Sequence, residues 1–104
     1  MKIQINTDNN IVGREGMVAH FESVIGSALD RFSEKITRVE VHLNDVNGNK
    51  SGPDDKRCML EARLEGMQPV AVSHQAETLE KAVSGATDKL KKSLDSSLGR
   101  LRNY

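Results

Sequence analysis

The chain of 104 residues has no tryptophan, two phenylalanines, one tyrosine and a single cysteine. A single thiol cannot close an internal disulfide, so the chain is not a small secreted domain held together by disulfides. No apolar run approaches the roughly 18 residues that a membrane span requires. The start, MKIQINTDNN, has neither the apolar stretch nor the cleavage site of a secretory signal. We therefore expect a cytoplasmic protein with no membrane partner.

An excess of charge of either sign is also missing, because 15 lysines and arginines balance 15 aspartates and glutamates. Overall basicity therefore gives no argument for nucleic-acid binding, and the distribution of charge becomes the informative quantity. Between residues 79 and 102, six cations stand against three carboxylates. The C-terminal segment is basic and the rest of the chain is correspondingly acidic.

The spacing of apolar residues predicts an α+β fold in the order β-α-β-β-β-α. Alternation predicts strands in KIQIN, ITRVEVHLNDV, KRCMLEARLE and VAVSH, with Cys58 buried in the third. Steps of three and four predict a first helix from Met17 to Phe32 and a second from Leu79 to about residue 102, with Thr78 as its N-cap. The polar stretch 45–55 predicts a loop. We expect one domain over residues 1–104, a four-stranded sheet with both helices packed on one face.

The sequence contains no pattern that would indicate catalysis or a bound cofactor. The loop DVNGNKSGPDDK resembles a calcium-binding loop at Asp45, but Lys50 replaces the required glycine and Lys56 the closing glutamate. The three histidines lie on separate elements without a second ligand at metal spacing. No nucleophile motif, phosphate loop or dinucleotide fingerprint is present. We expect neither an enzyme nor a small-molecule substrate, and no metal or cofactor.

The basic residues of the last helix are the strongest candidate for a binding surface. At about 100° per residue, one flank of this helix gathers four cations into a ridge and the opposite flank holds two more. Spaced cations of this kind can each meet a phosphate, although a solvated helix face has the same pattern. The ridge consists of Lys81, Lys89, Lys92 and Arg100, and the opposite flank carries Lys91 and Arg102. Scarce aromatics argue against stacking on unpaired bases, since Phe21 and Phe32 fit the core.

Several segments resemble the ribosome hibernation promoting factor family, also called ribosome-associated inhibitors or ribosomal subunit interface proteins. They are INTDNNIV, ITRVEVHL and above all KAVSGATDKLKKSL. The resemblance covers nearly the whole chain. It implies the β-α-β-β-β-α fold and a function in translation regulation: binding in the mRNA and tRNA channel of the small ribosomal subunit in resting, stressed cells. It also implies rRNA contacts at Lys89 and Lys92, and more loosely at Lys91, Arg100 and Arg102.

The sequence departs from the family pattern in ways that keep a second function open. Where the family usually has lysines on the first helix, this chain has Ser23 and Ser27, so that only Arg31 and Lys35 remain as RNA-binding candidates near its end. Glu80 replaces the usual aromatic at the start of the last helix. Long members of the family add a C-terminal dimerisation domain, which we do not expect here. The alternative is a protein-interaction module of the same fold with weak RNA affinity, including a homodimer formed through the polar sheet face or a strand edge.

Overall fold

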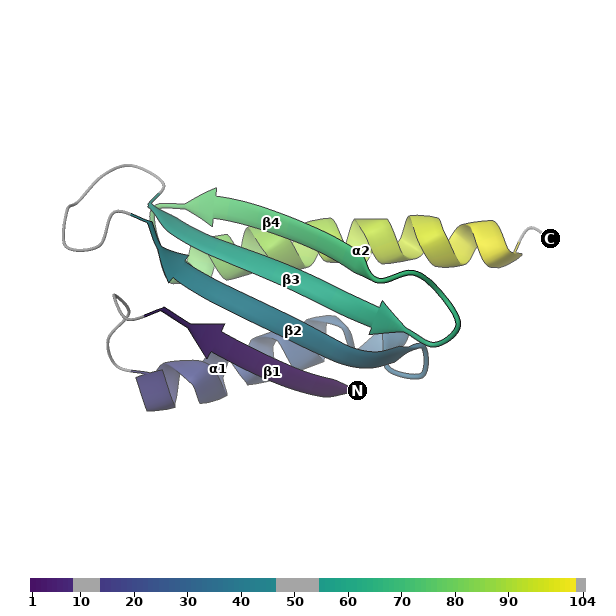
Figure 1. The fold of residues 1–104 in the computed structure, drawn as a ribbon, viewed down its shortest axis with the longest axis horizontal. Coiled ribbons are helices and arrows are strands. Elements are labelled where there is room, and N and C mark those ends of the chain that lie inside the picture. The colour runs from purple at the N-terminus through teal and green to yellow at the C-terminus, as the bar shows by residue number, and fades with distance from the viewer. Residues whose placement is uncertain (9–13, 47–54, 103–104) are drawn as a thin grey trace.

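A computed structural model describes residues 1–8, 14–46 and 55–102, with the side chains of residues 14 and 100–102 left out of the description. Its elements follow the predicted order (Figure 1). The strands are β1 (Lys2–Thr7), β2 (Ile36–Asp45), β3 (Lys56–Leu64) and β4 (Val70–Ala76), and the helices are α1 (Arg14–Ala28), a short 3-10 helix η1 (Asp30–Phe32) and α2 (Leu79–Arg102). The predicted α+β fold is confirmed.

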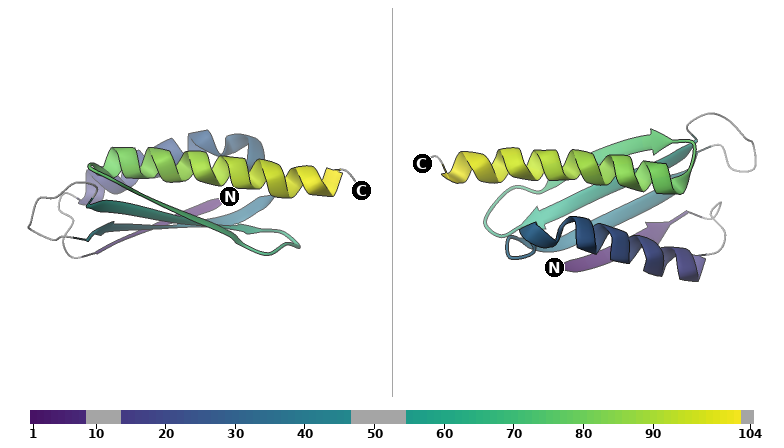
Figure 2. Two further views of the ribbon diagram at one scale, coloured as in Figure 1. Left: turned by 90° about the horizontal axis from the view of Figure 1, so that it is seen from above. Right: turned by 180° about the vertical axis from the view of Figure 1, so that it is seen from behind.

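The four strands form one mixed sheet in the order β1-β2-β3-β4. β1 pairs in parallel with β2, placing Ile3 beside Val39, while the two following pairs are antiparallel. Both helices cover the same face, α1 over β1 and α2 over β3 and β4, and they run in the same direction (Figure 2). The opposite face of the sheet carries no helix of the described residues. The predicted two-layer arrangement is therefore present.

The core lies between the sheet and the two helices, and alternation along the strands fills it. Apolar residues of β2 and β3 that alternate with polar ones are fully buried, as are Leu90 and Leu94 of α2. Cys58 is one of these residues, and burial raises the pKa of its thiol to about 12 because the charged form would lose its hydration. The thiol is thus a core group and not a reactive nucleophile.

α2 begins where the sequence indicates. The Thr78 hydroxyl oxygen accepts a hydrogen bond from the Lys81 backbone N–H at 3.1 Å, as an N-cap residue does. Gly85 is required by packing, since a Cβ there would lie 2.1 Å from Cδ2 of His74 on β4. The backbone of α2 at Gly85 therefore packs directly against the His74 ring.

The first helix differs from its prediction. It ends at Ala28 instead of continuing to Phe32, and η1 follows after Leu29. The Phe32 N–H donates to the Leu29 carbonyl oxygen at 2.9 Å, a tighter turn that brings the Phe32 ring into the core with 5% exposure. Apolar spacing alone cannot distinguish this turn from a continued α-helix. Of the predicted loop 45–55, residues 47–54 lie outside the described residues.

Candidate nucleic-acid interface

The two flanks of α2 differ in their balance of charge. The flank that faces β4 holds Lys89, whose ammonium group reaches that strand. The flank that faces α1 holds Glu80 and Asp95, which contact His20 and Arg31 respectively. At about 100° per residue, Lys81 and Lys92 fall on the β4 side of the solvent-facing surface. The zero net charge of the whole chain thus conceals a helix with a cationic β4 flank and an α1 flank on which carboxylates predominate.

Lys89 is held in place by the edge of the sheet. Its Nζ donates a hydrogen bond to the backbone carbonyl oxygen of Ser73, on the outer edge of β4, at 3.0 Å. This bond satisfies a carbonyl that an edge strand would otherwise present to another chain. An ammonium group has three donors, so two remain for an anion. Lys89 is therefore an ordered cation that retains capacity to bind a phosphate oxygen.

Lys92 and Lys81 differ in how much of their charge is available. Lys92 is exposed, and within the described residues no carboxylate pairs with it. Lys81 is exposed too, but its ammonium group binds the carboxylate of Glu77 one turn earlier. That hydrogen bond lowers the pKa of the Glu77 carboxyl group. Of the two lysines, Lys92 is the stronger candidate for a phosphate contact.

Arg31 and Lys35 do not extend the cationic flank onto the first helix. The two terminal guanidinium nitrogens of Arg31 donate hydrogen bonds to the Asp95 carboxylate at 2.8 Å, and its Cζ lies 4.2 Å from the centre of the Phe32 ring. Hydrogen bonding to Asp95 raises the pKa of Arg31. Arg31 would have to leave this bidentate pair to meet a phosphate. Lys35 is exposed beside it and lines the same hollow, of about 510 Å³.

The remaining predicted residues are distributed over both flanks. Lys91 is half-buried on the α1 side of α2, away from Lys89. Arg100 and Arg102 belong to the last turns of α2, but their side chains lie outside the described residues. The structure thus brings Lys89 and Lys92 together on one flank and separates Lys91 and Arg31 from them.

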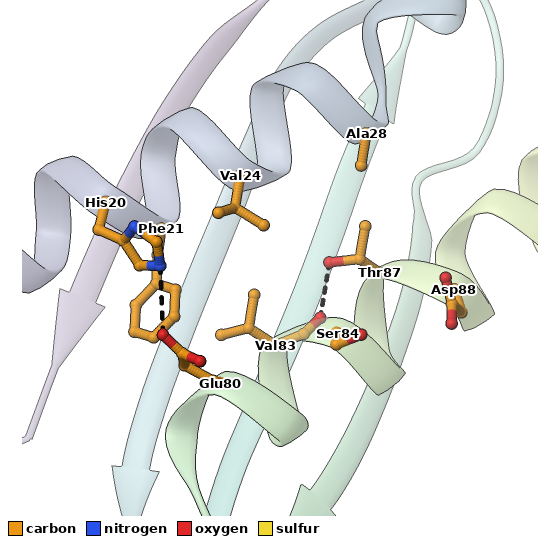
Figure 3. A pocket seen from close by; sticks show the side chains of 9 residues that line it. All are labelled: His20, Phe21, Val24, Ala28, Glu80, Val83, Ser84, Thr87 and Asp88. Atoms are coloured by element: carbon orange, nitrogen blue, oxygen red, sulfur yellow. Dashed lines mark hydrogen bonds and ion pairs between the residues drawn. The ribbon is translucent and has the colours of Figure 1, made fainter.

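Between the two helices lies a groove with an anionic rim (Figure 3). Its volume is about 260 Å³, and it is lined from α1 by His20, Phe21, Val24 and Ala28, and from α2 by Glu80, Val83, Ser84, Thr87 and Asp88. The Thr87 hydroxyl group donates to the Val83 carbonyl oxygen at 2.6 Å and is therefore satisfied within the helix. Carboxylates at this rim disfavour a polyanion, so the groove is a poorer candidate for phosphate contacts than the β4 flank.

The open face of the sheet is a second charged surface, which the sequence analysis treated only as a polar face for protein contacts. Arg38 pairs with Glu40 at 3.1 Å, and Arg63 lies 3.4 Å from Glu61. Register places Arg57 on the same face, where no described carboxylate pairs with it. This face thus carries two carboxylates, those of Glu40 and Glu61, and four cations, which are Lys2, Arg38, Arg57 and Arg63. This charged face could have been predicted from the sequence, because charged residues alternate with apolar ones in ITRVEVHL and KRCMLEARL.

The described residues contain no helix long and apolar enough to cross a membrane.

Comparisons with known proteins agree with this architecture. The structure is similar to the N-terminal domain of Protein Y from Thermus thermophilus, with a TM-score of 0.72 and 19% identity over 92% of this chain and 98% of that one. It is also similar to a ribosomal subunit interface protein from Coxiella burnetii, with a TM-score of 0.71 and 16% identity over 95% of this chain and 99% of that one. At such identities the likeness establishes the fold. No protein of curated function matches the sequence.

The family model described as Sigma 54 modulation protein / S30EA ribosomal protein matches residues 3–102. The match spans β1 to the end of α2 and so includes both flanks described above. The chain therefore belongs to this family, which confirms its resemblance to the ribosome hibernation promoting factors.

Proposed function

We propose that the protein is a cytoplasmic, non-enzymatic factor that binds the small ribosomal subunit and inhibits translation by occupying the mRNA and tRNA channel. The family match over residues 3–102 is the observation that carries the proposal. Among the similar structures, the one from Coxiella burnetii is a ribosomal subunit interface protein, which supports the proposal. The β4 flank of α2 supplies the rRNA contacts in this proposal.

The contacts begin with Lys89 and Lys92. Lys89 is pre-positioned by the Ser73 carbonyl oxygen, so it loses less side-chain freedom on binding than an unanchored lysine. Lys92 lies about one turn away and forms no ion pair with a described carboxylate. By helical spacing Arg100 would continue the contact along the same flank, and Lys81 would join it after leaving Glu77. Arg102 falls on the opposite flank with Lys91 and would not share this contact. This footprint is narrower than one that uses both helices.

Co-sedimentation with purified small subunits at low and high salt tests the proposal. Binding at low salt that weakens at high salt is expected for phosphate contacts. Replacing Lys89 and Lys92 together by alanine should weaken binding about tenfold or more per lost contact. The matched control is Lys2→Ala, which removes one cation from the open sheet face. An equal loss in the control, or no co-sedimentation of the wild type at low salt, would exclude the proposed interface.

A second candidate function is a self-associating module of the same fold. Three observations favour it: Arg14–Ala28 contains no lysine, Arg31 is engaged by Asp95, and the sheet face carries interleaved charges of both signs. A surface with alternating cations and carboxylates can pair with a second copy of itself. Analytical ultracentrifugation distinguishes the two functions. A mass that rises with concentration, together with subunit binding indifferent to salt, would favour the homodimer.

A further inference from the structure

The groove between the helices combines an apolar floor with an exposed apolar wall. Phe21 and Val83 form buried parts of it, whereas Val24 is 39% exposed and is one of the exposed large hydrophobic residues of the described chain. In Figure 3, Val24 of α1 and Val83 of α2 face each other across the groove. The two helices therefore leave apolar surface in contact with water along their shared seam.

The rim of this groove is anionic. Glu80 and Asp88 line it from α2, two turns apart on the flank that faces α1. Among the described residues, the rim's other titratable group is His20, whose Nε2 lies 3.4 Å from a Glu80 carboxylate oxygen. No lysine or arginine of the part of the chain that the structure describes lines the groove. An occupant that carries cations on both sides of an apolar group would match this pattern.

The size of the groove limits the occupant further. Its volume of about 260 Å³ lies below the roughly 300–1,000 Å³ of sites that enclose drug-sized ligands or cofactors. One aliphatic side chain fits such a space, and the rest of the ligand would lie along the rim. An RNA strand would place phosphates against Glu80 and Asp88, which is electrostatically unfavourable.

We propose that this groove binds a cationic peptide segment, with one aliphatic side chain inserted between Val24 and Val83 and flanking lysines or arginines paired with Glu80 and Asp88. The site is separate from the β4 flank of α2, so one molecule can hold RNA on one side and a basic protein segment on the other. The inference does not require RNA binding, because it rests on the groove alone.

Fluorescence polarisation with a labelled peptide that has one leucine between lysines tests the proposal on the full chain. Replacing the peptide leucine by serine should weaken binding about tenfold, because the buried apolar contact is lost. The protein double variant Glu80→Gln, Asp88→Asn should weaken it about threefold to tenfold, as expected for two exposed ion pairs. The matched control is Glu22→Gln, which removes a carboxylate of α1 that lines a different hollow.

Several results would overturn the proposal. The groove is not the site if the double variant binds the peptide as the wild type does, if Glu22→Gln weakens binding equally, or if a glutamate-flanked leucine peptide binds as well. No binding of the peptide, with a mass that rises with protein concentration, would mean that a second copy covers the groove. Lys92→Ala separates this proposal from the proposed function, since it should reduce binding to the small ribosomal subunit and leave peptide binding unchanged.

Discussion

Replacing Gly85 by alanine tests the close packing of α2 on β4, which places Lys89 at the sheet edge. A Cβ at this position would lie 2.1, 2.4 and 2.6 Å from Cδ2, Nε2 and Cγ of His74, so the ring or the helix must move. Overpacking of this kind costs about 1–3 kcal/mol, while alanine in a helix gains up to about 1 kcal/mol over glycine. We expect a net loss of about 0.5–2 kcal/mol in the free energy of unfolding, measured by urea denaturation.

A double-mutant cycle isolates the cause. In a His74→Ala background the clash is absent, so Gly85→Ala should become stabilising by up to about 1 kcal/mol. Gly99→Ala is the control on the same helix, because a Cβ there meets nothing within 4 Å. Stabilisation by Gly85→Ala in the wild-type background, as large as that by Gly99→Ala, would refute the packing of α2 against His74.

Three further predictions follow from the described contacts. Asp95→Asn should release Arg31 from its ion pair and tighten small-subunit binding at low salt. The slope of log K against log salt should become steeper by the amount expected for about one more phosphate contact. An unchanged slope would show that Arg31 does not reach RNA. Thr78→Ala should cost about 1 kcal/mol of stability by urea denaturation and Thr78→Ser almost nothing, and equal losses would exclude the cap. Burial raises the pKa of the Cys58 thiol from 9.0 to about 12, so the folded state retains a proton that the unfolded state releases between these values. The resulting contribution to the free energy of unfolding is complete below about pH 9 and is lost as the pH rises toward 12. The wild type should therefore lose more stability than Cys58→Ala between about pH 8 and pH 10.

Local patterns predicted most of the fold. The Thr78 cap and the leucine steps predicted α2, and strict alternation predicted that Cys58 would be buried. These features depend on neighbours along the chain, which a sequence displays directly. The turn that carries Phe32 into the core was predicted wrongly, because a 3-10 turn and a continued helix share the same apolar spacing.

The candidate site was harder to predict because its electrostatics depend on contacts between distant residues. The two flanks of α2 follow from helical spacing, so the grouping of Lys89 with Lys92 could be anticipated. The bidentate pair of Arg31 with Asp95 joins residues 64 positions apart, and it changes which cations are available. The bond from Lys89 to the Ser73 carbonyl likewise depends on the position of α2 over the sheet edge. Such pairings come from packing and not from local sequence.

The salt dependence of small-subunit binding, compared between the wild type and Lys92→Ala, tests the central claim most directly. If the β4 flank of α2 meets rRNA phosphates, log K for the wild type should fall linearly with log salt, and the variant's slope should be shallower by about 0.7–0.9. Asp88→Asn serves as the control for a charge change on the same helix, and it should not flatten the slope. Parallel slopes for the wild type and Lys92→Ala would contradict the account.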